Sequence, residues 1–335
     1  MGTLHITNGD HAGDKLRCFV DGPVTLACDV LHEGPCPSVD GDAWHEVRAR
    51  FLAGPSRPAD EIKASLAAGD RTIVDACRRG DDIVLWFEHD LFDQLALIRT
   101  LDLVARLAPR AAKTASLICI GAFPGVARFI GLGQLTADQL ATLAGTGSPV
   151  TAGHFALALD AWRAFRSPDP SELVRIARQL DAPRRASIEG GAALPFLGDA
   201  LLRFLAEFPC VVNGLSRTEA LALDELLNGA ITAEALFIAT QAREPSPFLG
   251  DLTFFDMLRA LASARVPLVH LDADAGTIDL RAHQVAISDA GRDVLACRAD
   301  HVRLNGIDCW RGGVHLAGSS HSPWRWDADA ETLVS

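Results

Sequence analysis

Charged and polar side chains gather directly after an apolar run in the first third of the chain. Glu88, His89 and Asp90 follow that run without a break, and Asp93 and Gln94 come shortly afterwards. Carboxylate oxygens are hard ligands suited to Mg²⁺ or Mn²⁺, and an imidazole exchanges protons near neutral pH. These residue types at the end of one buried strand predict a catalytic group made of Glu88, His89 and Asp90.

Three further loops carry polar groups or glycines after short apolar runs. They begin near Asn8, Asp29 and Gly121. In a parallel sheet the carboxyl ends of the strands lie at one edge, and ligands bind there. We therefore expect side chains from the loops to surround the catalytic group. The predicted ligand-binding residues are Asn8, Asp10, His11, Asp29, Glu33, Asp93 and Gln94.

Two kinds of ligand fit such a group. One is a divalent metal ion, Mg²⁺ or Mn²⁺, which would polarise a phosphoryl or carbonyl oxygen or activate water for hydrolysis or transfer. The other is a polar or phosphate-bearing small molecule bound without a metal. A plainer interpretation is that Asp90 and Asp93 cap the following helix, and that Asn8 and Gly9 form a turn. The sequence leaves the substrate, the metal and the existence of turnover open.

Several well-known catalytic motifs are missing from the chain. It contains no G-x-x-x-x-G-K-[ST], no G-x-G-x-x-G after the first strand, no G-x-S-x-G and no H-E-x-x-H. These absences argue against P-loop ATPases, ordinary Rossmann dehydrogenases, α/β-hydrolases and zincins.

The elements that must position these residues alternate between strands and helices. Short apolar runs predict strands at 4–6, 24–27, 83–87 and 117–120, with helices between them, which is typical of a parallel α/β sheet. The clearest helix follows the third strand and is expected to close at Pro109.

The chain is predicted to have four parts. Residues 1–145 form an α/β domain with the candidate site, and residues 146–210 form a helical connector with a loose loop at 183–191. Residues 211–300 form a winged-helix-like domain, and residues 301–335 form an aromatic-rich hairpin tail. The expected class is therefore α/β, with a helical middle segment and a winged-helix-like C-terminal region.

The winged-helix-like prediction rests on helix caps and a hairpin. Ser216 and Glu219 form a capping box before the first of three helices, the runs 268–271 and 278–280 flank a turn, and Ser288 caps a closing helix. Residues 211–300 contain seven arginines, no lysine and thirteen acidic residues, a net charge of −6. Because DNA readers need basic flanks, this charge favours docking on protein over binding DNA.

Six stretches of the sequence carry a family resemblance: Asn8-Gly9-Asp10, Glu33-Gly34-Pro35, Trp86–Leu95, Leu215–Glu219, Leu304–Asp308 and Gly312–Leu316. They resemble the bacterial domain-of-unknown-function 1835 family, including the tail of its longer members. The resemblance implies a cytoplasmic bacterial protein with an N-terminal α/β domain and a C-terminal winged-helix-like domain. It brings no established catalytic residue. Cys309 departs from the expected basic residue before the tryptophan of the tail.

The overall composition restricts the partners. The 335 residues include 31 Lys and Arg against 43 Asp and Glu, a net charge of −12, which argues against a chain that coats nucleic acid or an anionic membrane. The N-terminal residues lack the pattern of a signal peptide, and the eight cysteines form no C-x-x-C pair. We expect a cytoplasmic protein with free thiols.

Two functional hypotheses follow. In the first, the α/β domain binds a metal ion or phosphate-bearing molecule and carries out hydrolysis or transfer. In the second, the chain is a transcription-related regulator or adaptor without catalysis, and its winged-helix-like region docks on protein or DNA.

Overall fold

A computed structural model describes residues 2–27, 29–54, 57–107, 115–185, 193–274, 276–277, 279–318 and 324–335, with the backbone alone for residues 182–185. The chain divides into two compact units. The first comprises residues 1–201 and 310–314, and the second comprises residues 202–309 and 315–335. Residues 146–201 thus belong to the same unit as the sheet, whereas the sequence predicts a separate connector there.

The first unit is built on a five-stranded sheet in the order β2-β1-β3-β4-β5. Its four parallel strands, all predicted, are β1 Thr3–Thr7, β2 Val24–Leu26, β3 Asp82–Glu88 and β4 Ala115–Ile120. The short β5, Ser148–Pro149, pairs antiparallel with β4 and was not predicted. The α/β class with a mainly parallel sheet is confirmed.

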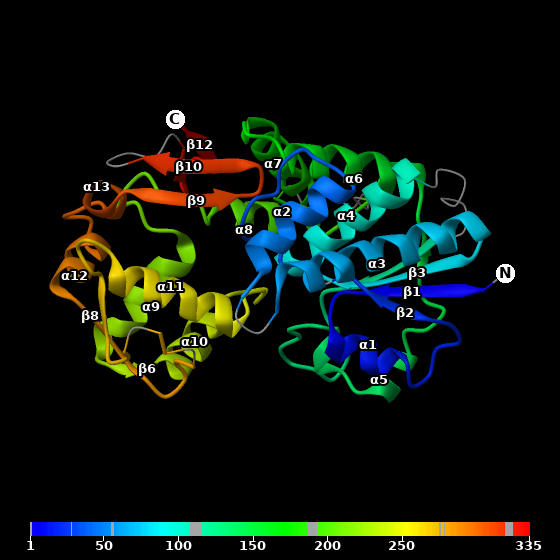
Figure 1. The fold of residues 1–335 in the computed structure, drawn as a ribbon, viewed down its shortest axis with the longest axis horizontal. Coiled ribbons are helices and arrows are strands. Elements are labelled where there is room, and N and C mark those ends of the chain that lie inside the picture. Colours follow the sequence, from blue (N-terminus) through cyan, green and yellow to red (C-terminus); the bar gives the residue numbers. More distant parts are fainter. Residues whose placement is uncertain are drawn as a thin grey trace. The chain divides into compact units, whose positions relative to one another are not determined.

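Helices cover both faces of this sheet, which explains why β3 is an almost continuous apolar run. One face carries α1 Asp10–Leu16 and α5 Ala137–Ala141, and the other carries α2 Asp42–Leu52, α3 Ala59–Arg79, α4 Leu91–Leu107 and α6 Ala152–Phe165 (Figure 1). The helix after β1 therefore lies on one face, and the helix after β3 lies on the other. In open α/β sheets, ligands generally bind at the carboxyl ends of neighbouring strands whose connections separate in this way.

Local signals explain several helix ends. A capping box of Thr136 and Gln139 opens α5, as predicted. The Asp169 carboxylate accepts a hydrogen bond from the Ser171 backbone N–H at the start of α7, Ser171–Arg185. The remaining elements of this region are η2 Leu132–Gln134 and α8 Leu197–Leu205.

Two predictions for this region concern boundaries. The predicted loose loop at 183–191 is wrong at its start, because residues 183–185 belong to α7. Residues 186–191 lie outside the described residues, as does Pro109, the predicted end of α4.

The described residues of the second unit form three helices, a small sheet and two short closing helices, with the 3₁₀ helix η3 after the first of the three helices. Its helices are α9 Arg217–Glu225, η3 Leu226–Asn228, α10 Ala233–Ala242, α11 Asp251–Ser263, α12 Asp289–Leu295 and α13 His301–Asn305. Its antiparallel sheet has the order β6-β8-β7, from β6 Ile231–Thr232, β7 Val269–Leu271 and β8 Gln284–Ile287. The capping box of Ser216 and Glu219 and the cap by Ser288 are confirmed.

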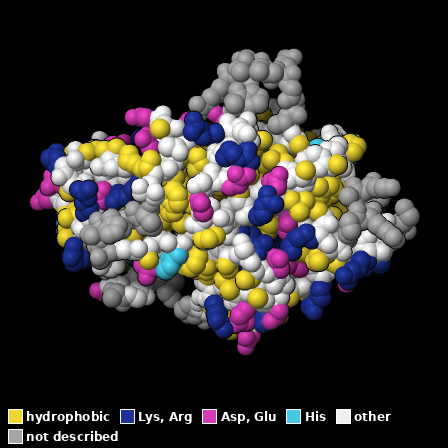
Figure 2. Space-filling view, turned by 90° about the horizontal axis from the view of Figure 1, so that it is seen from above, with side chains coloured by type: hydrophobic (Ala, Val, Ile, Leu, Met, Phe, Trp, Pro, Cys, Tyr) yellow, Lys and Arg dark blue, Asp and Glu magenta, His cyan; other side chains and the backbone are white. Residues whose placement is uncertain are grey.

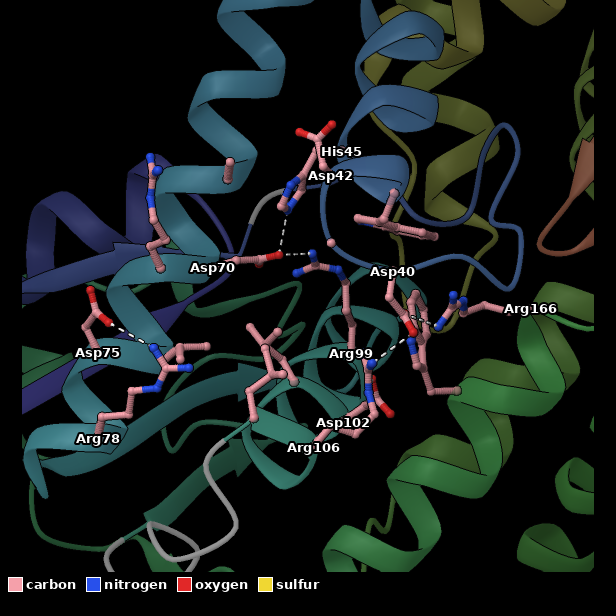
Figure 3. A pocket seen from close by; sticks show the side chains of 18 residues that line it. Asp40, Asp42, His45, Asp70, Asp75, Arg78, Arg99, Asp102, Arg106 and Arg166 are labelled. Carbon is pink, nitrogen blue, oxygen red and sulfur yellow. Dashed lines mark hydrogen bonds and ion pairs between the residues drawn. The ribbon is translucent and has the colours of Figure 1, made fainter.

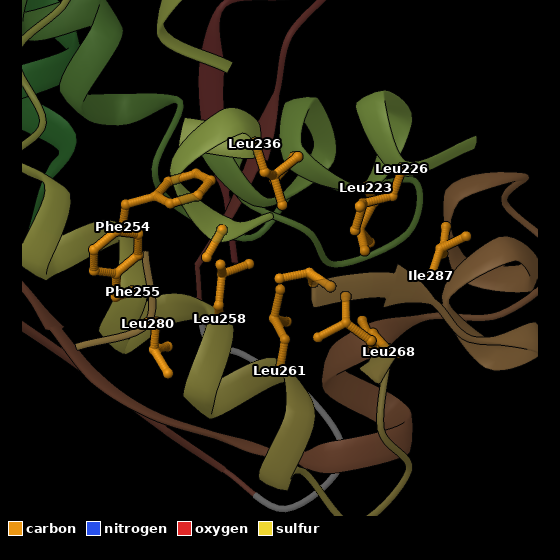
Figure 4. Packing of buried hydrophobic residues seen from close by; sticks show 14 of the residues in the cluster. Leu223, Leu226, Leu236, Phe254, Phe255, Leu258, Leu261, Leu268, Leu280 and Ile287 are labelled. Atoms are coloured by element: carbon orange, nitrogen blue, oxygen red, sulfur yellow. The ribbon is translucent and has the colours of Figure 1, made fainter. Parts of the chain in front are cut away.

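One predicted strand of this unit is corrected. The strand that pairs with β7 is Gln284–Ile287 and not 278–280, of which residue 278 lies outside the described residues. Burial alternates along β8, with Val285 and Ile287 buried, so its inward residues join the core. That core packs the helices against the sheet through fully buried side chains such as Leu223, Leu258 and Phe254 (Figure 4).

Two short hairpins form at the C-terminal end, where the sequence predicts one. They are β9 Ile307–Arg311 with β10 Val314–Gly318, and β11 Arg325–Asp327 with β12 Thr332–Val334. Acidic and basic side chains are interspersed on the face shown in Figure 2. Among the described residues, no helix combines the length and apolar character needed to cross a membrane.

Candidate functional site

The turn between β3 and α4 places three carboxyl groups side by side. Glu88 is the last residue of β3, and Asp90 precedes the first residue of α4. An oxygen of Asp90 accepts a hydrogen bond of 2.8 Å from the backbone N–H of Asp93, so Asp90 does cap the helix. The ligand atoms of Glu88, Asp90 and Asp93 all lie within 4.8 Å of one another. We call these three residues the carboxyl cluster.

Asn8, from the end of β1, joins the carboxyl cluster. Its side-chain amide donates hydrogen bonds to Asp93 and, at 3.4 Å, to Glu88. The other oxygen of Asp93 accepts a bond of 2.9 Å from the backbone N–H of Glu88. The ends of two adjacent strands and the first turn of α4 therefore converge on one point, at the carboxyl ends of β1 and β3.

The carboxyl cluster is buried without a positive side chain. Glu88 is 5% exposed, Asp90 6% and Asp93 0%. No Lys, Arg or His of the described residues forms an ion pair with any of the three. Because charge in a protein interior is costly unless it is compensated, such a group requires protons or a bound cation.

The pKa values of the carboxyl cluster reflect this uncompensated burial. Burial and the neighbouring Asp90 raise the pKa of Glu88 to about 8, and burial raises the pKa of Asp90 to about 7. Burial, Glu88 and Asp90 together raise the pKa of Asp93 well above its usual value. At neutral pH the cluster retains protons, which a divalent cation could replace.

A loop after β4 closes over Glu88. The backbone N–H of Leu132, at the start of η2, donates a hydrogen bond to the Glu88 carboxylate. Gly131 precedes it with φ +150°, and a Cβ at this position would overlap the same carboxylate. Glycine is therefore required here, both for the backbone conformation and for the close approach.

His89 lies beside the carboxyl cluster without joining it. Its ring centroid is 5.7 Å from that of Phe129 and 6.0 Å from that of Phe196. Burial lowers its pKa, so the imidazole is neutral at physiological pH. Among the described residues its buried Nδ1 has no hydrogen-bond partner. A neutral ring of this kind can accept a proton or bind a metal ion.

Two buried oxygen atoms near these strand ends also lack a donor among the described residues. They are the hydroxyl of Thr7, on the last residue of β1, and the Oε1 atom of Gln94. The amide nitrogen of Gln94 donates a hydrogen bond of 2.6 Å to the Glu88 carbonyl. Gln94 thus supports the backbone of the cluster, and its free oxygen remains able to bind water.

Four predicted ligand-binding residues are not brought into the carboxyl cluster. Asp10 and His11 are exposed in the first turn of α1. Both oxygens of Asp29 accept hydrogen bonds from the buried Arg48 guanidinium. The backbone carbonyl of Glu33 accepts a further hydrogen bond from the same guanidinium. Asp29 and Glu33 therefore hold their own loop in place.

Sequence reasoning missed three contributors to the site. Thr7 ends β1 inside an apolar run, and Gly131 and Leu132 lie in a loop with no acidic side chain or histidine. The Gly-Leu-Gly segment at 131–133 is a weak sequence signal that the backbone there lies close to another group. Its target, Glu88, is 44 positions earlier in the chain and cannot be read from the sequence.

Comparison with known proteins does not assign the chain to a family. No protein-family model matches the chain, and no curated protein matches it. The resemblance to the domain-of-unknown-function 1835 family thus rests on the sequence stretches alone and remains a prediction.

Proposed function

We propose that the first unit binds a divalent cation, Mg²⁺ or Mn²⁺, through Glu88, Asp90 and Asp93. Through that cation it would hold a phosphate-bearing small molecule. The observation that carries this proposal is the convergence of three buried carboxyl groups with no positive side chain paired to them among the described residues. Both metals favour oxygen ligands and octahedral coordination, and Mg²⁺ usually retains several waters beside one or two protein carboxylates.

The place of the carboxyl cluster in the sheet supports a small-molecule ligand. It lies at the carboxyl ends of β1 and β3, whose following helices lie on opposite faces. This point of an open α/β sheet is where ligands generally bind. A cation there would present an open coordination position to a phosphoryl oxygen.

Metal-assisted hydrolysis or transfer is the reaction class that we propose for this site. The neutral imidazole of His89, next in sequence to Glu88, is suited to accept a proton from water or from a substrate hydroxyl. We further propose that the protein is a cytoplasmic bacterial member of the domain-of-unknown-function 1835 family, as its sequence stretches imply.

Titration with MnCl₂ tests the cation site directly, by calorimetry and by the electron paramagnetic resonance of free Mn²⁺. We expect one site in the wild type and a loss of at least about tenfold in affinity for Asp93→Asn, since one charged ligand is removed. Asp10→Asn is the matched control, because Asp10 was predicted to bind the ligand yet is exposed and outside the carboxyl cluster. Equal losses in both variants, or no binding by the wild type, would refute the proposal.

A second proposal concerns residues 211–300, for which we propose a winged-helix-like fold that docks on protein. The order of three helices, an antiparallel ribbon and a closing helix favours this fold. Leu227, Ile238 and Leu252 are 44%, 61% and 62% exposed, and the net charge of the region is −6. Exposed apolar side chains on an acidic surface suit a protein partner better than DNA.

Gel-shift assays with genomic DNA fragments at physiological salt separate these partners. We expect no shift from the intact chain, and expect chemical crosslinks to a protein partner that Ile238→Asp removes. A salt-sensitive DNA shift would instead assign this region to nucleic acid.

A further inference from the structure

A second cavity lies in the first unit, among the helices on one face of the sheet. Its volume is about 620 Å³, which is within the range of small-molecule sites. Residues one helical turn apart on α3 and on α4 form two of its walls, and the start of α2 and the end of α6 form the others (Figure 3). None of the carboxyl cluster lines it.

The charged groups of this cavity are ordered by ion pairs. Asp70 binds both Arg99 and His45 at 2.8 Å, and Asp40 binds both Arg106 and Arg166, at 2.9 and 3.0 Å (Figure 3). Burial pushes the pKa of Asp70 upward, but its bonds to His45 and Arg99 lower it below the usual value. The aspartates of this cavity are paired with basic side chains, in contrast to the acids of the carboxyl cluster.

The charged side chains of the lining balance in number, but one arginine lacks an acidic partner among the described residues. It contains five arginines and five aspartates. Asp42 pairs with Lys63 outside the lining, and Lys63 also pairs with Glu46. Arg71 lines the cavity and has no acidic partner among the described residues. Arg71 is therefore the arginine of the lining that is available to pair with an anion.

Arg99 offers the best-placed donors. Its side chain is 13% exposed, and among the described residues it makes one hydrogen bond, to Asp70, out of the five that a guanidinium can donate. Its guanidinium also lies over the ring of Trp44, 5.6 Å from the centroid. Stacking and the ion pair hold Arg99 in place, so that binding an anion costs little side-chain entropy.

The rest of the lining is largely apolar. Val74 and Leu103 come from the facing helices α3 and α4, and Trp44 and Trp162 pack edge to face with centroids 5.5 Å apart. A small inorganic anion would leave these surfaces without a partner. A ligand with a hydrocarbon chain or ring would cover them.

We propose that this cavity binds an organic anion, a single carboxylate on an apolar chain or ring, with Arg99 and Arg71 binding the carboxylate. This site is distinct from the cation site, and the proposal does not require that the cation site be occupied. The apolar body would pack on Val74, Leu103 and the tryptophans.

Three probes that differ only in the head group test the proposal: 3-phenylpropionate, 3-phenylpropan-1-ol and 3-phenylpropylamine. Binding is measured by calorimetry and by saturation-transfer NMR on the intact chain, with a chelator present to exclude the cation site. We expect the carboxylate to bind at least about tenfold more tightly than the alcohol, which corresponds to about 1.4 kcal/mol, and the amine to bind least.

Four variants locate the binding. Arg99→Gln and Arg71→Gln should each reduce the preference for the carboxylate, and Ala67→Phe, which fills the cavity, should remove binding of all three probes. Arg163→Gln removes the same charge from an exposed arginine of α6 outside the cavity, and should change nothing. If Arg99→Gln fails to fold, the proposal is tested by the binding of the three probes to Arg71→Gln and Ala67→Phe. Equal binding of acid and alcohol, undiminished binding by Ala67→Phe, or no binding at millimolar concentration would overturn the proposal.

Discussion

The side-chain amide of Asn8 donates a hydrogen bond to the carboxylate of Asp93, which follows it by 85 positions in the sequence. The same amide reaches Glu88, so one neutral side chain bridges two acids of the carboxyl cluster. The contact fixes the end of β1 against the start of α4.

Asn8→Ala should destabilise the protein at neutral pH. The substitution leaves buried carboxyl oxygens without their donor, which costs about 1–3 kcal/mol. Urea unfolding at constant pH measures the change in the free energy of unfolding. Asn228→Ala, at an exposed position, is the control and should be nearly neutral. A loss no greater than that of the control would show that the contact carries no stabilisation.

Stability should depend on pH in a direction set by the raised pKa values. Unfolded carboxyl groups release their protons near about pH 4, whereas Asp90 and Glu88 retain theirs to about 7 and about 8 in the folded protein. Between these values the folded state binds more protons than the unfolded state. The free energy of unfolding therefore falls as the pH rises through this window.

A divalent cation should reverse this pH-dependent loss of stability. Thermal unfolding in a chelator should shift to lower temperature from about pH 5 to about pH 8, and saturating Mg²⁺ should restore it mainly at the higher pH. Glu88→Gln removes one of the titrating groups, so both the pH dependence and the Mg²⁺ effect should shrink. A stabilisation by Mg²⁺ that is equal at both pH values would contradict this linkage.

Gly131→Ala should weaken cation binding without a direct change to any ligand. The added Cβ overlaps the Glu88 carboxylate and forces it to move. Gly125→Ala is a matched control, because Gly125 also has a positive φ, +81°, but a Cβ there meets nothing within 4 Å. We expect both variants to lose some stability from backbone strain, and only Gly131→Ala to lose Mn²⁺ affinity in calorimetry.

Arg48→Met should be among the most destabilising single substitutions in the first unit. Arg48 is 0% exposed and donates to Asp29 and to the carbonyls of Val30, Glu33 and Pro35. Its removal leaves the buried Asp29 charge unpaired, at a cost of about 3–5 kcal/mol in urea unfolding.

The control for Arg48 lies two positions along the same helix. Arg50 forms an exposed pair with Glu46, so Arg50→Met should cost about 1 kcal/mol or less. Similar losses for the two variants would argue against this assignment to Arg48.

The parallel strands and the residues of the carboxyl cluster could be predicted from the sequence, because both depend on local patterns. Apolar runs mark buried strands, and Glu88, Asp90 and Asp93 lie within one turn of chain. Asp29 was predicted to join the site, but its carboxylate accepts hydrogen bonds from Arg48, on a helix 19 positions later. No periodicity reveals which of several charges an arginine will neutralise.

The helix-lined cavity was also missed, although part of its signal is local. Asp70, Val74 and Arg78 share one face of α3, as Arg99, Leu103 and Arg106 do on α4. Charged residues on such a face are usually solvated. That these two faces oppose each other follows only from the packing of the helices on the sheet.

Helix α4 carries both proposed sites. Asp93 lies in its first turn and Arg99 six positions further, about 9 Å along the helix axis. A cation held by Asp93 and an anion held by Arg99 would attract each other through the protein interior. By thermodynamic reciprocity, each ligand would then tighten the binding of the other by the same factor, so α4 would make two separate pockets a cooperative pair.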